Sequence, residues 1–191
     1  YKFSTHLSGK HNLYNVTAAI CVAIEENISI KNIAKGLSDF QGVGRRFEIS
    51  KIYLEDQPHV LIDDYGHHPV EILSTILATK EKFPRKKICM IFEPHRYTRT
   101  QQLFDDFVRV LSKVNFLLLL DIYPASEKPI KGISSKKLAF QIMKNHKNVH
   151  YLGSQDPIDW LQKNHQDFSI LITQGAGTIS KLNYEIKKKW R

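Results

Sequence analysis

The chain has 191 residues, of which 42% are hydrophobic and 25% are charged, a composition typical of a globular domain and not of a disordered segment. Its 28 lysines and arginines exceed its 19 aspartates and glutamates, so the formal charge is +9. This charge makes anionic partners the first to consider: nucleic acid, membrane headgroups or a small anion. The longest apolar run, residues 114–120, is far shorter than the roughly 20 residues that a membrane-spanning helix needs.

The first residues carry no initiator Met and none of the charged start, apolar stretch and cleavage site of a signal peptide. We therefore expect the chain to be a piece of a larger protein. Cys21 and Cys89 lie inside apolar segments, where a reduced thiol packs like a small hydrophobic side chain. We expect a cytoplasmic chain without disulfides.

The first 40 residues carry a helical pattern. Apolar residues from Leu13 to Ile24 recur every three or four positions, which predicts a helix over residues 12–26, and a second short helix is predicted over residues 30–40. Residues 41–46 include two glycines that break the pattern and predict a linker. We place a domain boundary there, between residues 1–42 and residues 43–191.

After the linker, strand-like runs alternate with amphipathic helices. Strands are predicted over residues 47–54, 59–62, 87–92, 116–122, 148–152 and 169–173. Helices are predicted over residues 69–83, 98–113, 134–145, 157–162 and 178–189. Strands without polar interruption that alternate with helices are typical of a parallel sheet. The predicted fold class is α/β, a Rossmann-like, mainly parallel sheet with helices on both faces, preceded by a short helical segment.

Four polar clusters directly follow predicted strands, at residues 63–69, 93–99, 121–127 and 174–177. In doubly wound sheets, ligands bind beyond the carboxyl ends of the strands. Because those ends share one edge of a parallel sheet, we expect the clusters to form one functional site.

Arg96 and Arg99 stand three residues apart at the start of a predicted helix, beside backbone N–H groups that have no partner within the helix. Such an arrangement suits a carboxylate or a phosphate. The alternative is a set of surface ion pairs with Asp105, Asp106 or Glu93. The position at a strand end favours the anion site.

His67 and His68 precede Pro69, which suits the first position of a helix. A neutral imidazole there could position a nucleophile, accept a proton or bind a metal, and one of the two adjacent rings could be purely structural. No Cys or Glu-x-x-His pattern supplies further ligands, so we predict no zinc site. Asp63 and Asp64 end a strand where a carboxylate often binds ribose, but these two residues alone favour a capping role.

Two further motifs point to a nucleotide. Asn12 and Asn15 could offer amide donors and acceptors to a nucleobase, with helix capping as the alternative. Gly-Ala-Gly at residues 175–177 resembles a piece of a phosphate loop. The chain contains no complete P-loop motif, so it does not by itself hold a triphosphate in that way.

Five motifs occur in a fixed order along the chain. They are GKHNLYN at residues 9–15, GVGRRFE at 42–48, DDYGHHP at 63–69, PHRYTRT at 94–100 and QGAG at 174–177. This series closely resembles the bacterial Mur ligases, ATP-dependent enzymes of peptidoglycan precursor synthesis and cell-wall biogenesis. Within that family, HRYTR at residues 95–99 is most similar to the members that join L-alanine to UDP-N-acetylmuramate.

The resemblance implies a place for the chain in a three-domain enzyme. Residues 1–42 would be the C-terminal end of the central ATPase domain, and residues 43–191 the C-terminal Rossmann-like domain. ATP would phosphorylate the lactyl carboxylate of UDP-N-acetylmuramate, and the amine of L-alanine would attack the acyl phosphate. Mg²⁺, held mainly by the missing part of the central domain, and the arginines would neutralise charge. We expect the 191 residues alone to be inactive, because the P-loop is absent from them.

The resemblance also implies roles for single residues. The residues implied to bind ATP are His11, Asn12, Asn15, Arg46 and Asp64, with Arg46 at the γ-phosphate and Asp64 at the ribose. Those implied to bind L-alanine are Tyr65, His67, Arg96 and Arg99. Arg46 and His67 would be catalytic, whereas His68 and His95 receive no catalytic role.

Two other hypotheses stay open at this point. One is a non-catalytic, basic Rossmann-like module for nucleotide or nucleic acid, although the chain lacks the interleaved aromatics of a single-strand binder. The other is a ligase of the same family for a different amino acid. We expect neither nucleic acid nor membrane as a partner.

Overall fold

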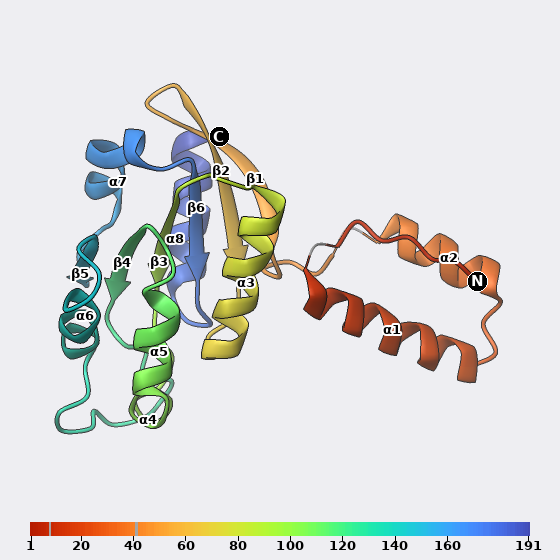
Figure 1. Ribbon diagram of the computed structural model, residues 1–191, viewed down its shortest axis with the longest axis horizontal. Coiled ribbons are helices and arrows are strands. Elements are labelled where there is room, and N and C mark those ends of the chain that lie inside the picture. Colours follow the sequence, from red (N-terminus) through yellow and green to blue (C-terminus); the bar gives the residue numbers. More distant parts are fainter. Residues whose placement is uncertain (8, 41) are drawn as a thin grey trace.

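A pair of helices precedes the sheet in the chain. The computed structural model describes residues 1–7, 9–40 and 42–191, and the side chain of His11 lies outside what it describes. Helices α1 (Lys10–Glu25) and α2 (Ile30–Asp39) run side by side in opposite directions (Figure 1). The hydroxyl of Ser29 starts α2 by accepting the N–H of Asn32 at 3.3 Å.

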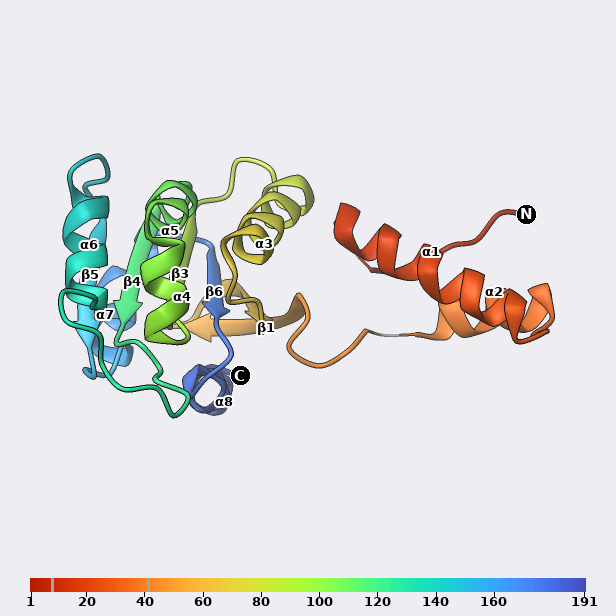
Figure 2. The same cartoon turned by 90° about the horizontal axis from the view of Figure 1, so that it is seen from below.

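The apolar side of α1 remains largely uncovered. Leu13 and Ile24, which define the helical pattern in the sequence, are 56% and 48% exposed. Of the helices and strands described for the sheet domain, α3 lies nearest to α1, as two views agree (Figures 1 and 2). The helix pair therefore presents an apolar surface without a cover from the residues described here.

The remaining chain forms one six-stranded sheet. Its strands are β1 (Glu48–Leu54), β2 (Gln57–Asp64), β3 (Ile88–Phe92), β4 (Phe116–Leu120), β5 (Val149–Gly153) and β6 (Ile170–Gln174). The spatial order is β1-β2-β6-β3-β4-β5, and every neighbouring pair is parallel except the antiparallel hairpin β1–β2. The predicted α/β fold with a mainly parallel sheet is confirmed.

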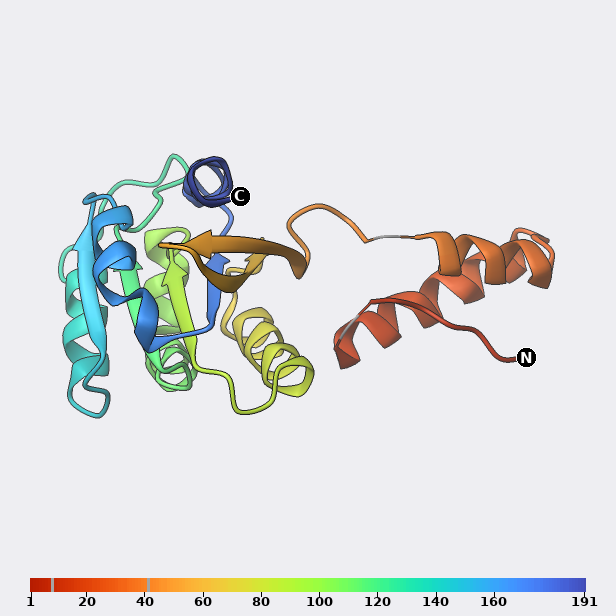
Figure 3. The ribbon, with the colours of Figure 1, turned by 90° about the horizontal axis from the view of Figure 1, so that it is seen from above.

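Helices cover both faces of this sheet. They are α3 (Pro69–Lys82), α4 (Tyr97–Gln102), α5 (Phe104–Leu111), α6 (Ser135–Met143), α7 (Ile158–Asn164), the 3-10 turn η1 (His165–Asp167) and α8 (Ile179–Trp190). Helices α3, α5 and α6 lie on one face and α8 on the other (Figures 2 and 3).

Strand β3 shows why the strands read as unbroken apolar runs. Met90 and Phe92 pack into the core under α3, α5 and α6, whereas Cys89 and Ile91 pack into the core under α7 and α8. All four side chains are fully buried. Burial of each large apolar side chain is worth about 1.5–3 kcal/mol, so the two cores hold the strand from both sides.

Most predicted elements differ from the structure by one or two residues at an end, and two differences have a clear physical reason. The helix predicted over residues 98–113 is two helices, because Leu103 leaves helical geometry at φ −113° and turns its side chain toward the core beneath α5. Strand β2 starts before the predicted residue 59, because Pro58 pairs with Tyr53 next to the turn of the hairpin, at the start of the strand, where proline is tolerated.

The carboxyl ends of the parallel strands meet at one edge, as expected. Asp64 pairs in register with Gln174, and Gln174 pairs with Phe92, so the last residues of β2, β6 and β3 stand in one row. Whatever follows these three strands is thereby brought together.

None of the helices in the described ranges is both long and apolar enough to cross a bilayer.

The burial of the two cysteines predicts their reactivity. Cys21 is exposed on α1, whereas Cys89 is fully buried in β3, and this burial raises the pKa of its thiol. We expect iodoacetamide to modify one thiol per native chain and two in denaturant, as counted by mass spectrometry. Cys21→Ser should abolish native labelling, and equal labelling rates at the two thiols would contradict the fold.

Candidate functional site

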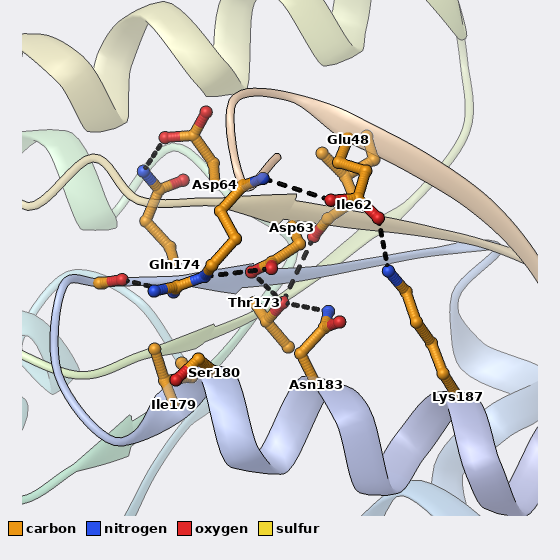
Figure 4. Close-up of polar contacts among 12 residues, drawn as sticks. Glu48, Ile62, Asp63, Asp64, Thr173, Gln174, Ile179, Ser180, Asn183 and Lys187 are labelled. Carbon is orange, nitrogen blue, oxygen red and sulfur yellow. Dashed lines mark hydrogen bonds and ion pairs between the residues drawn. The ribbon is translucent and has the colours of Figure 1, made fainter. Parts of the chain in front are cut away.

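The carboxylate of Asp64 joins the linker to the row of strand ends. Its Oδ1 accepts the N–H of Gly66 and the Nε2 of Gln174, both at 2.8 Å, and its Oδ2 accepts the N–H of Phe47 at 2.9 Å. Figure 4 shows Asp64 and Gln174 facing each other. Asp64 is only 6% exposed, so these donors replace water around a buried carboxylate.

Gln174 is a site residue that sequence reasoning did not single out. Its Nε2 donates to Asp64 Oδ1 and to the carbonyl of Gly66, each at 2.8 Å, and two acceptors on one side fix the orientation of the amide. Its Oε1 is buried and has no hydrogen-bond donor among the described residues. The available signal was an amide side chain that directly follows an apolar strand.

Gly66 is confined by its neighbours. A Cβ added there would lie 2.6 Å from Asp64 Oδ1, 2.7 Å from Gln174 Nε2 and 2.9 Å from Glu71 Cβ. Only glycine fits between the strand ends and the start of α3 without displacing these groups.

Four of the five residues implied to bind ATP border one cavity. Asn12 and Asn15 come from α1, Arg46 from the linker and Asp64 from β2, and the open cavity between them has a volume of about 750 Å³. Its remaining lining includes Leu7, Phe40, Val43, Val70 and Thr75. A mainly apolar pocket of this size with a few polar groups suits a small molecule with a flat ring. The fifth residue, His11, has no described side chain.

A row of rings lies beyond Asp64. The ring of Tyr65 lies 5.5 Å from that of His67, His67 lies 5.0 Å from His95, and His95 stacks on Tyr123 at 5.5 Å. The loops after β3 and β4 are tied together because the N–H of Tyr123 donates to the carbonyl of Pro94 at 2.8 Å. This pairing fixes His95 and the residues that follow it.

Arg96 and Arg99 have different partners. Nη1 of Arg99 lies 3.2 Å from Nδ1 of His95 and donates to the carbonyl of His95 at 3.3 Å. Nη1 of Arg96 lies 4.0 Å from Oε1 of Glu127. Arg99 therefore belongs to the row of rings, whereas Arg96, with a half-exposed side chain, lies at its rim.

The start of α4 is partly occupied by an internal carboxylate. Glu127 accepts the N–H of Thr98 at 3.0 Å and its hydroxyl at 2.6 Å. Of the three acids considered as alternative partners of the arginines, two are engaged elsewhere: Glu93 accepts the N–H of Ile179 at 3.0 Å, and Asp106 pairs with Arg109. A ligand carboxylate would thus meet the guanidinium groups rather than the amides of α4.

The two ring-row histidines are held neutral at pH 7. Burial lowers the pKa of His67, and the positive charges of Arg99 and Arg46 lower it further. Burial also lowers the pKa of His95, and a proton on His67 or the charge of Arg99 lowers it further. A neutral imidazole keeps one ring nitrogen as a proton acceptor.

His68 caps a helix in the structure, one of the roles that the sequence left open for the two adjacent histidines. Its Nδ1 accepts the N–H of Val70 at 3.3 Å, while Glu71 accepts the N–H groups of His67 and His68 at 2.9 and 3.0 Å. Burial acts to raise the pKa of Glu71, but these two donors outweigh it, and the net shift is downward. This reciprocal cap fixes the start of α3 and the backbone of His67.

Across the described ranges, no three His, Cys, Asp or Glu side chains come together in an arrangement that could hold a metal ion.

Comparison with known proteins identifies the class. The family model described as Mur ligase, glutamate ligase domain, matches residues 45–177, and the chain belongs to the Mur ligase family. Over 187 residues it is 41% identical to UDP-N-acetylmuramate–L-alanine ligase of Psychrobacter arcticus. The aligned residues make up 97% of this chain and 39% of that relative. The match supports the ligase hypothesis and gives no support to a non-catalytic nucleic-acid module.

Solved structures agree with this fold. UDP-N-acetylmuramate-alanine ligase MurC of Thermotoga maritima has a TM-score of 0.75 at 22% identity, over 99% of this chain and 40% of that one. The murein peptide ligase Mpl of P. arcticus has a TM-score of 0.65 at 18% identity, and the match covers 97% of this chain and 38% of that one. The chain thus spans about two-fifths of the length of these relatives.

The confinement of Gly66 predicts the effect of a single methyl group. We expect Gly66→Ala to lower the free energy of unfolding by about 1–3 kcal/mol, because the Cβ overlaps Asp64 and Gln174. Gly36→Ala is the matched control, since nothing lies within 4 Å of its Cβ and alanine favours a helix interior. Urea unfolding measures both, and an unchanged midpoint for Gly66→Ala would contradict the packing.

The lowered pKa values of His67 and His95 predict an NMR titration. Both rings should titrate below about 6.5, and Arg99→Gln should raise both midpoints because it removes a repulsive charge. Since the unfolded chain binds these protons at higher pH, the two histidines lower the stability of the fold as pH falls below about 6.5. Arg109→Gln is the control, because this exposed arginine in the last turn of α5 pairs with Asp106 and does not act on either ring; midpoints above 6.5 would refute neutral rings.

Proposed function

We propose that the chain is the C-terminal part of an ATP-dependent ligase that joins L-alanine to UDP-N-acetylmuramate through an acyl phosphate. The observation that carries this proposal is the position of Tyr65. Its ring lies 5.4 Å from the guanidinium carbon of Arg46, which borders the cavity, and 5.5 Å from the ring of His67, which begins the row leading to Arg99. A nucleotide site and an amino-acid site would thus share one border.

In the nucleotide site, the apolar lining would pack against adenine, and Asn12 and Asn15 would bond its ring edge. Asp64 would bond the ribose. Arg46 is exposed beside the cavity and would meet the γ-phosphate, where charge develops during transfer. Mg²⁺ would be held by phosphate oxygens and mainly by residues of the rest of the central domain.

In the amino-acid site, Arg99 and Arg96 would bind the carboxylate of L-alanine. The rings of Tyr65 and His67 would pack beside its methyl group and leave room only for a small side chain. The amine nitrogen would attack the acyl carbon of the acyl phosphate, the carbon–oxygen bond to phosphate would break, and phosphate would leave. Neutral His67 would accept the proton that the amine loses, so Arg46 and His67 are the catalytic residues of this proposal.

Residues 1–42 would complete the central ATPase domain, and residues 43–191 would be the C-terminal domain. The exposed apolar side chains of α1, such as Leu13 and Val22, would then be covered by the rest of the central domain. That domain would supply the P-loop. The reaction would take place in the cytoplasm, as a step of peptidoglycan precursor synthesis.

Ligation in the full-length enzyme tests this proposal, with ADP release followed as a function of each substrate. We expect release to depend on both UDP-N-acetylmuramate and L-alanine, and the 191 residues alone to be inactive. Arg99→Gln should raise KM for L-alanine by about 10- to 150-fold, the effect of losing about 1.5–3 kcal/mol of charge-assisted binding, and should change KM for ATP less than twofold.

Arg109→Gln serves as the matched control, because this arginine pairs with Asp106 on α5 and should leave both KM values unchanged. Equal increases in both KM values for Arg99→Gln would remove the carboxylate role. A preference for another amino acid over L-alanine would favour a different member of the family. Turnover by the 191 residues alone would contradict the expectation that they need the P-loop of the central domain.

A further inference from the structure

Arg45 and Arg46 are neighbours with different surroundings. Arg46 is exposed and borders the cavity, whereas the side chain of Arg45 is only 23% exposed. Nε of Arg45 donates to Oδ2 of Asp63 at 3.1 Å, and its Nη2 donates to the carbonyl of Gly175 at 2.7 Å. One guanidinium group therefore joins the linker to the end of β2 and to the loop after β6.

The carboxylate that receives Arg45 is deeply buried. Asp63 is 3% exposed, and its Oδ1 accepts the hydroxyl of Thr173 at 3.0 Å, which in turn accepts Nδ2 of Asn183 at 2.7 Å. Figure 4 shows these side chains in line between the sheet and α8. Burial raises the pKa of Asp63, and the charge of Arg45 opposes that rise. A buried carboxylate needs such a partner, so the Arg45–Asp63 pair resists separation.

The backbone around Arg46 is fixed on both sides. Arg45 and Phe47 have φ values of 57° and 54°, a left-handed conformation that is costly for side chains other than glycine. The carbonyl of Arg45 accepts the N–H of Tyr65 at 2.7 Å, and the N–H of Phe47 donates to Asp64 at 2.9 Å. Without these bonds and the Arg45–Asp63 pair, the turn would relax.

We propose that Arg45, with Asp63 as its partner, is a positioning residue that holds the turn so that Arg46 is directed at the phosphates of the bound nucleotide. This inference rests on the proposed function, because it takes Arg46 to be the phosphate-binding group. Arg45 itself touches no substrate in this arrangement; it acts through Arg46. The ring of Tyr65, 5.4 Å from both guanidinium carbons, keeps the two side chains apart.

A double-mutant cycle in the full-length ligase tests this inference. In Arg45→Lys the charge remains, but a point-like ammonium group cannot bond Asp63 and Gly175 with a planar fork. We expect KM for ATP to rise about 10-fold and KM for L-alanine to stay within twofold. In an Arg46→Gln background, the same substitution should raise KM for ATP less than twofold, because no cationic group is left to direct at the phosphates.

Two more variants separate positioning from stability. Asp63→Asn keeps the size of the side chain but removes the charge that holds Arg45, and it should reproduce the effect on KM for ATP. Asn183→Ala breaks the other end of the same network and should lower the unfolding temperature without changing either KM.

The inference is overturned if Arg45→Lys leaves KM for ATP unchanged, or if it raises KM for ATP equally in both backgrounds. It is also overturned if Asn183→Ala raises KM for ATP as much as Arg45→Lys does. Loss of folding in both Arg45→Lys and Asp63→Asn would assign the pair to stability alone and overturn it too. An unmodified enzyme that does not ligate L-alanine would instead refute the proposed function, whereas an active enzyme with an additive cycle refutes only the positioning role.

Discussion

The structure of the site depends on two adjacent carboxylates at the end of β2. Asp64 binds the N–H of Phe47, the N–H of Gly66 and the amide of Gln174, whereas Asp63 binds Arg45. Because adjacent residues of a strand face opposite sides of the sheet, the two carboxylates hold different parts of the linker. Buried carboxylates need these donors, so the linker, β2 and β6 meet in one arrangement.

The same edge of the sheet keeps positive charge beside neutral rings. Burial disfavours a proton on His67, and the charges of Arg99 and Arg46 disfavour it further. An anionic ligand therefore meets fixed guanidinium groups, while the imidazole between them remains able to accept a proton. The proposed ligase reaction needs both anion binding and an uncharged amine, and this short row of side chains is compatible with both.

Sequence reasoning found the edge of the sheet but not its internal contacts. Asp63 and Asp64 suggested caps when considered alone, whereas the structure has them binding the linker and the end of β6. Gln174 was not singled out, because the value of its amide depends on residues about 110 positions earlier in the chain. The break at Leu103 was missed because helical periodicity continues through it while the packing direction changes.

The sequence by itself determined the α/β class, the order of the elements and the strand ends at which polar residues gather. Local periodicity and turn chemistry encode these, since each depends on residues close together in the chain. Only the tertiary structure decided that Arg45 pairs with Asp63 while Arg46 borders the cavity, and that Glu127 occupies the start of α4. Arg45 and Arg46 are identical side chains at adjacent positions, so local sequence does not distinguish them. Their roles differ because distant strands give them different burial and different partners.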